Sequence, residues 1–327
     1  GLTLVFVTHD LKLARRLCTR ALVLREGRCV EAGPLTELAR SARHPYTREL
    51  FDSLSLPALR GTAVGEPLLT AQALSAGWPR RGWQGWFRAP TPSLHALDLQ
   101  LSAGSAIGVV GASGAGKSTA VRALGGLLPA LAGSLKLHHH AGPRPQIVFQ
   151  DPYRSLSPRQ TVGATLDEVL AVHGTPTSAR PARIAELLAA VELAPALATR
   201  LPRTLSGGQR QRVAIARALA VRSRVLIGDE ALSALDARVQ VTVLRLLASL
   251  RDQRGLGLIH ISHDLASVRA LCTEVLVLDT GRVVERGPPD AVLVRPQHPA
   301  TQALVAAERA LGGWLGAESL ENPVNFS

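Results

Sequence analysis

The chain has 327 residues, of which 46% are hydrophobic and 19% charged, so it can bury the core of one large domain or two modest ones. Its formal net charge of +12 comes almost entirely from Arg, and these residues are scattered except at Arg80 to Arg88. Direct binding of nucleic acid is therefore not expected, and the charge indicates a solvated surface with some affinity for anionic lipid. No apolar run approaches the roughly 18 to 20 uncharged residues of a membrane-spanning helix, and the cysteines (Cys18, Cys29, Cys272) include no close pair, which favours reduced thiols.

The first fifty or so residues repeat a later part of the chain. When Gly1 is placed on Gly255, GLTLVFVTHDLKLARRLCTRALVLREGRCVEAGP aligns without a gap with GLGLIHISHDLASVRALCTEVLVLDTGRVVERGP. The register continues to HPYTREL against HPATQAL, and about half of the positions are identical, well above chance. We therefore expect residues 1–56 to be the C-terminal remnant of a first domain, as in a fragment of a tandem protein or the product of a wrongly placed start.

The complete copy follows a short connection. Residues 57–67 (PALRGTAVGEP) are rich in Pro, Gly and Ala and indicate a linker, so the complete domain is expected over 68–312, followed by a disordered tail at 313–327. Hydrophobic patterning predicts strands at 68–74, 106–110, 225–227 and 257–262, a helix at 237–251, and a final strand-turn-strand around Gly281. A helical middle is expected over about 152–219 as a separate lobe. Strands that alternate with helices predict an α/β fold with a mostly parallel, helix-flanked sheet.

A phosphate-binding loop follows the strand AIGVV. Residues 111–118, GASGAGKS, fit the pattern G-x-x-x-x-G-K-[ST] and open the helical segment STAVRALGGLL. Glycines allow backbone N–H groups to face phosphates, and a helix N-terminus favours the anion. Lys117 is then expected to reach the β and γ phosphates, and Ser118 to bind Mg²⁺. The alternative, a glycine-rich turn that merely fits the pattern, does not explain the strand before it and the helix after it.

Two further motifs follow in order. Leu205 to Gln209, LSGGQ, opens the helical segment RQRVAIARAL and predicts a second phosphate-cradling site without a lysine of its own. The apolar segment from Val225 ends in Asp229 and Glu230, which suit Mg²⁺ binding and alignment of an attacking water, respectively. An acidic pair after a buried strand is often only a helix N-terminus, so this motif gains its weight from the other two.

The ordered set resembles the ATPases of ABC transporters, whose signature is LSGGQ. The resemblance covers nearly the whole chain and implies a P-loop NTPase fold of ABC type, with a helical signature subdomain and an N-terminal antiparallel β part. It also implies a nucleotide site for ATP and Mg²⁺. The binding residues that it implies are Trp78, Gly111, Ala112, Ser113, Gly114, Ala115, Gly116, Lys117, Ser118, Thr119, Ser206, Gly207, Gly208, Gln209 and Asp236.

Other roles rest on the resemblance alone. It implies that Trp78 stacks on adenine, although Trp83, Trp86 and Phe87 are nearby competitors, and that Gln150 senses the γ-phosphate and Mg²⁺. Asp236 falls in the D-loop, and His263 is the switch histidine, matched by His9 in the first copy. The implied catalytic residues are Glu230, His263 and Gln150, and the implied metal ligands are Ser118, Gln150 and Asp229.

The stretch QDPYRSLSPRQTVG and the HPYT and HPAT segments resemble the ATPases of dipeptide, oligopeptide and nickel importers. The resemblance implies as partners a second ATPase domain, transmembrane permease subunits and an extracytoplasmic substrate-binding protein, with the chain peripheral at the cytoplasmic face of the plasma membrane. Phosphonate-processing ABC proteins, a soluble ABC ATPase acting on nucleic acid or ribosomes, and a hydrolysis-dead binding domain remain alternatives. Glu230 and His263 speak against the last of these.

Three features differ from the pattern of the ABC ATPases or raise the question of a metal site. Ala231-Leu232 replaces the usual Pro-Thr after the glutamate, which is expected to alter the path to the D-loop. No Cys follows Cys272, so an iron-sulfur site is not supported. The run from His138 to His140 is expected to alternate faces on a strand without partners, so no metal site is predicted there.

Overall fold

The computed structural model describes residues 3–8, 11–52, 56, 58–61, 65–78, 90–151, 155–232, 235 and 237–310. Its central sheet has six strands in the order β11-β10-β5-β9-β8-β7. All neighbours are parallel except β11, which pairs antiparallel with β10. Their bounds are β5 Ala106–Gly111, β7 Gln146–Phe149, β8 Val225–Asp229, β9 Gly257–Ile261, β10 Glu274–Asp279 and β11 Arg282–Gly287. The predicted α/β fold with a mostly parallel sheet is thus confirmed.

A separate antiparallel sheet forms the β part of the fold, in the order β4-β3-β6. Its strands are β3 Pro67–Trp78, β4 Thr91–Ser102 and β6 Ala130–Leu137. The first is longer than the predicted strand at 68–74, and β4 and β6 were not predicted as strands. Both pair with β3 in irregular registers, and Gly133 lies so close to β3 that a Cβ there would sit 2.2 Å from the Ala73 carbonyl oxygen.

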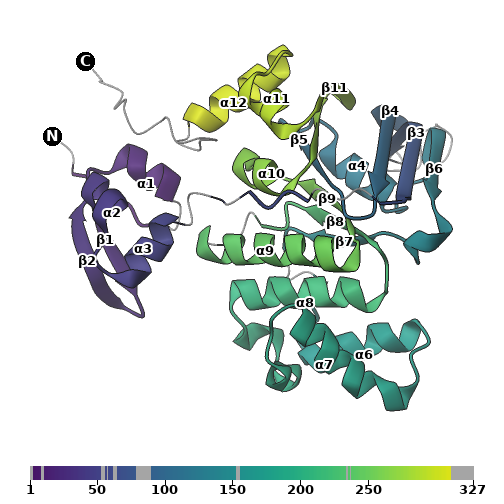
Figure 1. Cartoon of the computed structure of the whole chain (residues 1–327), viewed down its shortest axis with the longest axis horizontal. Helices are drawn as coiled ribbons and strands as arrows, with labels where there is room; N and C mark the ends of the chain where they lie inside the picture. Colours follow the sequence, from purple (N-terminus) through teal and green to yellow (C-terminus); the bar gives the residue numbers. More distant parts are fainter. Residues whose placement is uncertain are drawn as a thin grey trace, which may run out of the picture.

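Helices cover the central sheet and form the lobe between β7 and β8 (Figure 1). The helices of the complete copy are α4 Lys117–Leu124, α6 Val162–Val172, α7 Arg180–Ala190, α8 Gly207–Ala220, α9 Ala237–Arg254, α10 Leu265–Leu271, α11 Pro289–Val294 and α12 Pro299–Ala310. Short 3₁₀ turns are η2 His139–Ala141, η3 Thr177–Ala179, η4 Pro195–Thr199 and η5 Pro202–Thr204. Within the described ranges, none of the helices is both long and apolar enough to cross a bilayer.

The central sheet is buried on both faces, as parallel sheets are. Ile107 and Val109 pack with the antiparallel sheet and α4, whereas Ala106 and Val110 pack on the other side with α8, α9 and the helical lobe. This alternation follows from the two-residue period of a strand. Because β5 is parallel to its neighbours β10 and β9, the loop after β5 lies at the carboxyl edge of the sheet, where these two strands also end.

The N-terminal residues form their own small unit around Val23, Leu35, Leu38 and Phe51. It consists of α1 Leu11–Leu17, the hairpin β1 Arg20–Arg25 and β2 Arg28–Pro34, α2 Leu35–Ser41 and α3 Pro45–Asp52. It lies beside α9 in Figure 1, where Arg238 reaches Glu49 at 3.1 Å.

The repeat seen in the sequence extends to backbone detail. The β1-β2 hairpin shifts register between Val23 and Leu24, and the β10-β11 hairpin does so at the aligned pair Val277 and Leu278. The loop that follows is held in the same way in both copies. One glutamate accepts two backbone N–H bonds in each: Glu31 from Arg43 and His44 at 2.8 and 3.1 Å, and Glu285 from Gln297 and His298, both at 3.0 Å.

The histidine run differs from its prediction. Residues 139–141 form the 3₁₀ turn η2 rather than a strand, because the chain turns after β6. His138 Nε2 lies 3.0 Å from Thr70 Oγ1, and His140 Nε2 lies 2.7 Å from the Pro67 carbonyl oxygen, so both rings have structural partners. No group of three potential metal-ligating side chains occurs among the residues that the structure describes.

Candidate nucleotide site

The phosphate-binding loop joins β5 to α4 in a conformation that needs its glycines. Gly111 has a φ of 155°, and a Cβ there would lie 2.3 Å from the Leu278 carbonyl oxygen. Gly116 has a φ of 99°, and its Cβ would lie 2.8 Å from the Ser93 carbonyl oxygen. Both positions exclude an ordinary side chain, because the left-handed backbone and the close approach are each unfavourable for one. The loop therefore keeps the backbone exposed at the N-terminus of α4.

Lys117 folds back over this loop. Its Nζ donates to the carbonyl oxygens of Gly111 at 2.7 Å and Ala112 at 2.9 Å. Burial lowers the pKa of Lys117, while the carboxylates of Glu230 and Asp229 oppose that effect. The ammonium group therefore lies within electrostatic reach of both acidic residues that the sequence analysis singled out.

The two acidic residues stand at the end of β8. Asp229 is opposite Phe149 on β7 and Ile261 on β9, which places Gln150 and His263 just beyond the same sheet edge. Glu230 turns away from the strand with a φ of 50° and donates its backbone N–H to the Ile261 carbonyl oxygen at 2.9 Å. This left-handed backbone is strained for a residue with a side chain, and such strain is concentrated at functional sites.

The electrostatics of this edge favour a cation. Burial raises the pKa of Asp229, and the neighbouring Glu230 raises it further, against the opposing effect of Arg122 and Lys117. His263 Nδ1 lies 3.8 Å from Glu230 Oε2, and its side chain is 60% exposed. The arrangement joins one lysine, two carboxylates and one accessible imidazole at the mouth of the phosphate-binding loop, a set that can bind and act on a phosphate chain.

Trp78 lies next to the phosphate-binding helix. It ends β3 and is 43% exposed, and its Nε1 donates to Thr119 Oγ1 at 3.1 Å. Ser93 Oγ lies 3.0 Å from the same Thr119 oxygen. The Arg122 guanidinium carbon lies 4.6 Å from the centre of the Trp78 ring, a cation-π distance. Arg122 and Ser93 were not predicted as site residues, because nothing in the local sequence shows that β3 and β4 pack against α4.

The LSGGQ segment opens α8 with a capping box. Gln209 N donates to Ser206 Oγ at 3.3 Å, and Ser206 N donates to Gln209 Oε1 at 2.9 Å. A Cβ at Gly208 would lie 2.3 Å from Val239 Cγ1, so this glycine allows α8 to pack closely on α9. These contacts fix the N-terminus of α8, whose remaining backbone N–H groups are suited to an anion.

Several predicted residues are not covered. Asp236 of the D-loop, His9, Trp83, Trp86, Phe87 and the tail from residue 313 lie outside the described residues. Of the residues that are covered, Lys117, Asp229, Glu230 and His263 come together, with Thr119 and Trp78 beside them. The signature residues Ser206 to Gln209 form the N-terminus of α8, in the helical segment between β7 and β8. The hydrogen bonds of Ser206 described above are with Gln209.

Comparison with protein families gives two matches. The ABC transporter family model matches residues 94–233, which include the phosphate-binding loop, the signature and the acidic pair. A model for the C-terminal region of oligopeptide/dipeptide transporters matches residues 30–71. The second match covers the HPYT segment of the first copy.

The similar proteins include ATP-binding proteins of importers. The glutathione import ATP-binding protein GsiA of Salmonella typhimurium (strain LT2) is 37% identical over 346 residues, covering 93% of this chain and 55% of the relative. The protein of the same name from Escherichia coli (strain K12) gives the same identity and coverage. The chain thus spans about half the length of the curated relatives it matches.

Solved structures share the fold. The structure of cbiO1 from Clostridium perfringens, part of the ABC transporter complex cbiONQ, superposes with a TM-score of 0.60 at 25% identity, over 70% of this chain and 92% of that one. The dimeric bacterial ABC transporter cassette MJ0796 gives a TM-score of 0.56 at 24% identity, over 68% of this chain and 99% of that one. With the phosphate-binding loop, the signature and the acidic pair in place, residues 94–233 belong to the ABC transporter family, and residues 30–71 belong to the C-terminal region of oligopeptide/dipeptide transporters.

Proposed function

We propose that this chain binds and hydrolyses ATP. The observation that carries the proposal is the meeting of Lys117, Asp229, Glu230 and His263 at the carboxyl edge of the sheet, at the mouth of a glycine loop that excludes side chains. Lys117 and the backbone N–H groups of the loop bind the phosphates. Glu230 would orient the attacking water, and His263, whose Nδ1 lies 3.8 Å from that carboxylate, would contact the γ-phosphate.

Mg²⁺ fits this site. Burial, and to a lesser extent the neighbouring Glu230, raises the pKa of Asp229, and a divalent cation bound beside these two carboxylates would favour their charged forms. We propose that Ser118, Gln150 and Asp229 hold the ion, since these residues supply the oxygen ligands that Mg²⁺ prefers. The ion would offset the charge of the β and γ phosphates. Trp78 offers its exposed ring to the adenine, and Ser206, the glycines after it and Asp236 would complete a second face for the nucleotide.

The chain layout supports a tandem protein. The mirrored hairpin shifts and the glutamate-held loops around Glu31 and Glu285 support residues 1–56 as the C-terminal part of a first ATPase domain, with 57–67 as the linker and 68–312 as a complete second domain. The relatives that span about twice this length fit the same layout. A second ATPase domain is accordingly the proposed partner.

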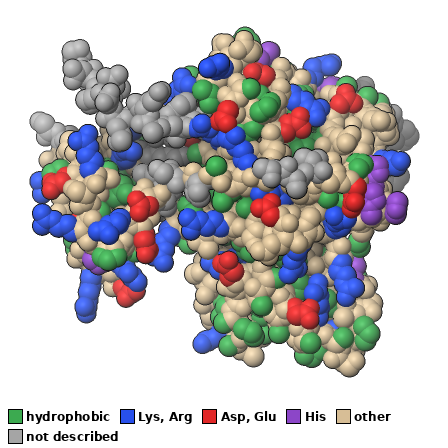
Figure 2. Space-filling model, viewed as in Figure 1, with side chains coloured by type: hydrophobic (Ala, Val, Ile, Leu, Met, Phe, Trp, Pro, Cys, Tyr) green, Lys and Arg blue, Asp and Glu red, His purple; other side chains and the backbone are tan. Residues whose placement is uncertain are grey.

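For the transported substrate we propose small peptides. The match to the oligopeptide/dipeptide region and the relatives named for glutathione import, itself a short peptide, support dipeptides, oligopeptides or related compounds, with nickel as the other substrate of similar importers. The proposed partners are transmembrane permease subunits and an extracytoplasmic binding protein, with this chain peripheral on the cytoplasmic face of the membrane. Lys and Arg are interspersed with acidic side chains on the face drawn in Figure 2, which supports this assignment over nucleic-acid binding.

A reconstitution experiment tests this proposal. The chain is mixed with proteoliposomes that carry its permease subunits and with empty liposomes, and the vesicles are floated. Retention only on permease vesicles, together with ATP hydrolysis stimulated by peptide-loaded binding protein, supports a peptide importer. Stimulation by RNA or ribosomes, or by phosphonates in place of peptides, would support the alternatives instead.

A further inference from the structure

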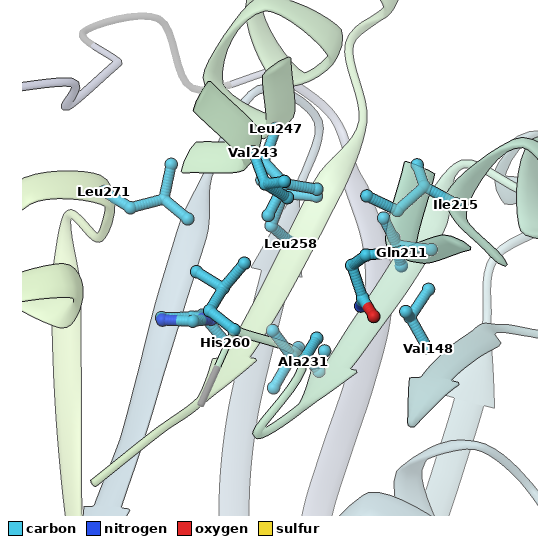
Figure 3. Close-up of a pocket in the computed structure, with 13 residues that line it drawn as sticks. Val148, Gln211, Ile215, Ala231, Val243, Leu247, Leu258, His260 and Leu271 are labelled. Carbon is cyan, nitrogen blue, oxygen red and sulfur yellow. The ribbon is translucent and has the colours of Figure 1, made fainter. Parts of the chain in front are cut away.

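A small space lies between the signature helix α8 and strand β8. It has a volume of about 20 Å³ for the centres of water-sized molecules, enough for at least one water. Its walls come from the strands β7, β8 and β9 and from the helices α8, α9 and α10, as Figure 3 shows. The lining is almost entirely apolar, with two polar side chains, Gln211 and His260.

Gln211 is the unusual member of this wall. Its side chain is fully buried, yet neither Nε2 nor Oε1 has a hydrogen-bond partner among the described residues. In Figure 3 the amide extends from α8 toward Ala231 and Val148. A buried primary amide without partners costs roughly 1 to 3 kcal/mol for each unsatisfied group, so natural proteins rarely leave one in that state.

His260 adds a second polar group. Its Nε2 lies 3.1 Å from Ser267 Oγ, and its Nδ1 faces strand β8, 3.8 Å from the position that a Cβ on Gly228 would occupy. Burial lowers the pKa of His260 to about 4, so the ring is neutral at pH 7 and each of its nitrogens can take part in a hydrogen bond. Polar groups therefore reach this space from α8 and from β9.

The space exists because two residues around the acidic pair are small. Gly228 precedes Asp229, and its backbone does not require glycine, since an added Cβ would meet only ordinary contacts of 3.6 Å or more. Ala231 follows Glu230, and neither it nor Leu232 offers a side-chain hydrogen-bonding atom. Larger or polar side chains at these positions would fill the space or pair with Gln211.

We infer that this space is a binding site for ordered water, held by the Gln211 amide, which joins the signature helix to strand β8 directly behind the acidic pair. The water completes the hydrogen bonds of Gln211 and gives α8 a polar connection to the strand. This inference depends only on the packing of α8 and β8, so its test is independent of the proposed ATPase activity.

Two substitutions separate a hydrated space from a dry one. Gln211→Met keeps the size of the side chain and removes its amide, and Gly228→Ala adds a methyl group to the space. If water is bound, both variants lower the midpoint of urea denaturation, because the first removes the groups that hold the water and the second displaces it from Gln211. If the space is dry, both raise the midpoint, because an unpaired amide is removed or a void is filled.

The control is Gln253→Met, the same chemical change at an exposed position of α9, which should leave the midpoint of urea denaturation unchanged. A crystal structure of the unchanged chain provides the direct readout. Density for a water within hydrogen-bond distance of the Gln211 amide supports the inference. A rise in midpoint for either variant, xenon bound in the space, or a Gln211 amide paired with protein groups would overturn it.

Discussion

Two opposing effects act on the pKa of Lys117. Burial lowers its pKa, whereas Glu230 and Asp229 favour the charged form. Its Nζ donates to the carbonyl oxygens of Gly111 and Ala112, so the ammonium group is already positioned over the loop. A phosphate chain would replace these contacts to neutral carbonyl oxygens with contacts to charged oxygens, so that both partners of each hydrogen bond are ionised.

We predict that Glu230→Gln separates binding from turnover. The amide keeps the size of the carboxylate but cannot accept a proton or align water in the same way, so ATP binding should remain while the hydrolysis rate falls about 100-fold or more. Lys117→Ala is the contrasting variant and should lose ATP binding itself. Nucleotide titration and single-turnover hydrolysis measure the two effects, and a normal hydrolysis rate in Glu230→Gln would refute the role of this residue.

The residues of this site differ in how well the sequence predicts them. Lys117, Asp229 and Glu230 could be found because each ends a predicted parallel strand or begins the helix after it, and such ends share one edge of a sheet. Arg122 could not, because its contact with Trp78 depends on an antiparallel sheet whose strands carry irregular registers. The local sequence holds no signal for that contact.

At the scale of elements, β3 and α4 are joined at their ends. Trp78 on the strand and Thr119 on the helix share a hydrogen bond, and Ser93 of β4 bonds the same Thr119 hydroxyl. The phosphate-binding helix therefore carries the aromatic ring with it. Arg122 covers the ring at 4.6 Å, so an adenine must use the remaining exposed surface or displace the guanidinium.

Trp78→Ala should weaken ATP binding about 2- to 10-fold, which corresponds to the roughly 0.5 to 1.5 kcal/mol typical of a stacked aromatic pair. Trp78→Phe keeps a stacking surface and should retain most of the affinity, although it loses the bond to Thr119. Dissociation constants for ATP and for triphosphate without a base measure the effect. An equal loss for both ligands would show that the ring acts on the loop rather than on the base.

The elements themselves were predictable in part. The strands β5, β8 and β9 are mostly apolar because they are buried on both faces, and their predicted bounds differ from the observed ones by one or two residues. The strand β6 was missed because its residues are mostly exposed and it contains Gly133, so it shows no hydrophobic alternation. The pairing with β3, rather than local preference, makes it a strand.

On the scale of the whole molecule, the connection between the two copies is fastened to the complete domain. Leu59 N donates to the Ala270 carbonyl oxygen at 2.8 Å, and the buried Arg251 donates to the Leu59 carbonyl oxygen at 2.6 Å. Asp290 accepts from Arg60 at 2.6 Å and from Arg269 at 2.7 Å. The sequence predicted a linker from its composition, but it held no information on these partners, which are distant along the chain.

The Asp290 contacts predict a dependence of stability on pH. The hydrogen bond from Arg60, aided by Arg269, lowers the pKa of Asp290 from 3.8 to about 2. Because the folded state holds the carboxylate in its charged form, this contribution is complete above about pH 4 and is lost as the pH falls through about 2. The group is largely exposed, so solvent screening limits the contribution to about 1 kcal/mol or less.

Asp290→Asn should therefore destabilise the chain slightly at pH 7, and its difference from the unchanged protein should shrink between pH 4 and pH 2. Urea denaturation at several pH values measures this difference. Arg60→Gln should reproduce part of the loss, and the double variant should lose less than the sum of the two single variants. A difference that stays constant down to pH 2 would contradict the assigned ion pair.

Two ATPase domains are expected to pair in order to hydrolyse ATP. The resemblance to ABC ATPases implies that each ATP is held between the phosphate-binding loop of one domain and the signature of the other. The charged groups that act on Lys117 are Glu230 and Asp229 of its own sheet, while Ser206 forms its capping box with Gln209 in the helical lobe. The described residues include one phosphate-binding loop and one signature segment.

Hydrolysis per molecule should therefore rise with protein concentration, because pairing of two copies brings Ser206 of one onto the nucleotide of the other. Ser206→Arg should abolish that rise, since a long charged side chain fills the contact, while ATP binding at the loop remains. Ser178→Arg places the same charge at an exposed position of the same lobe and should behave like the unchanged chain. If activity per molecule is independent of concentration and Ser206→Arg hydrolyses ATP normally, the domain works alone and α8 plays no part in binding the nucleotide of a partner.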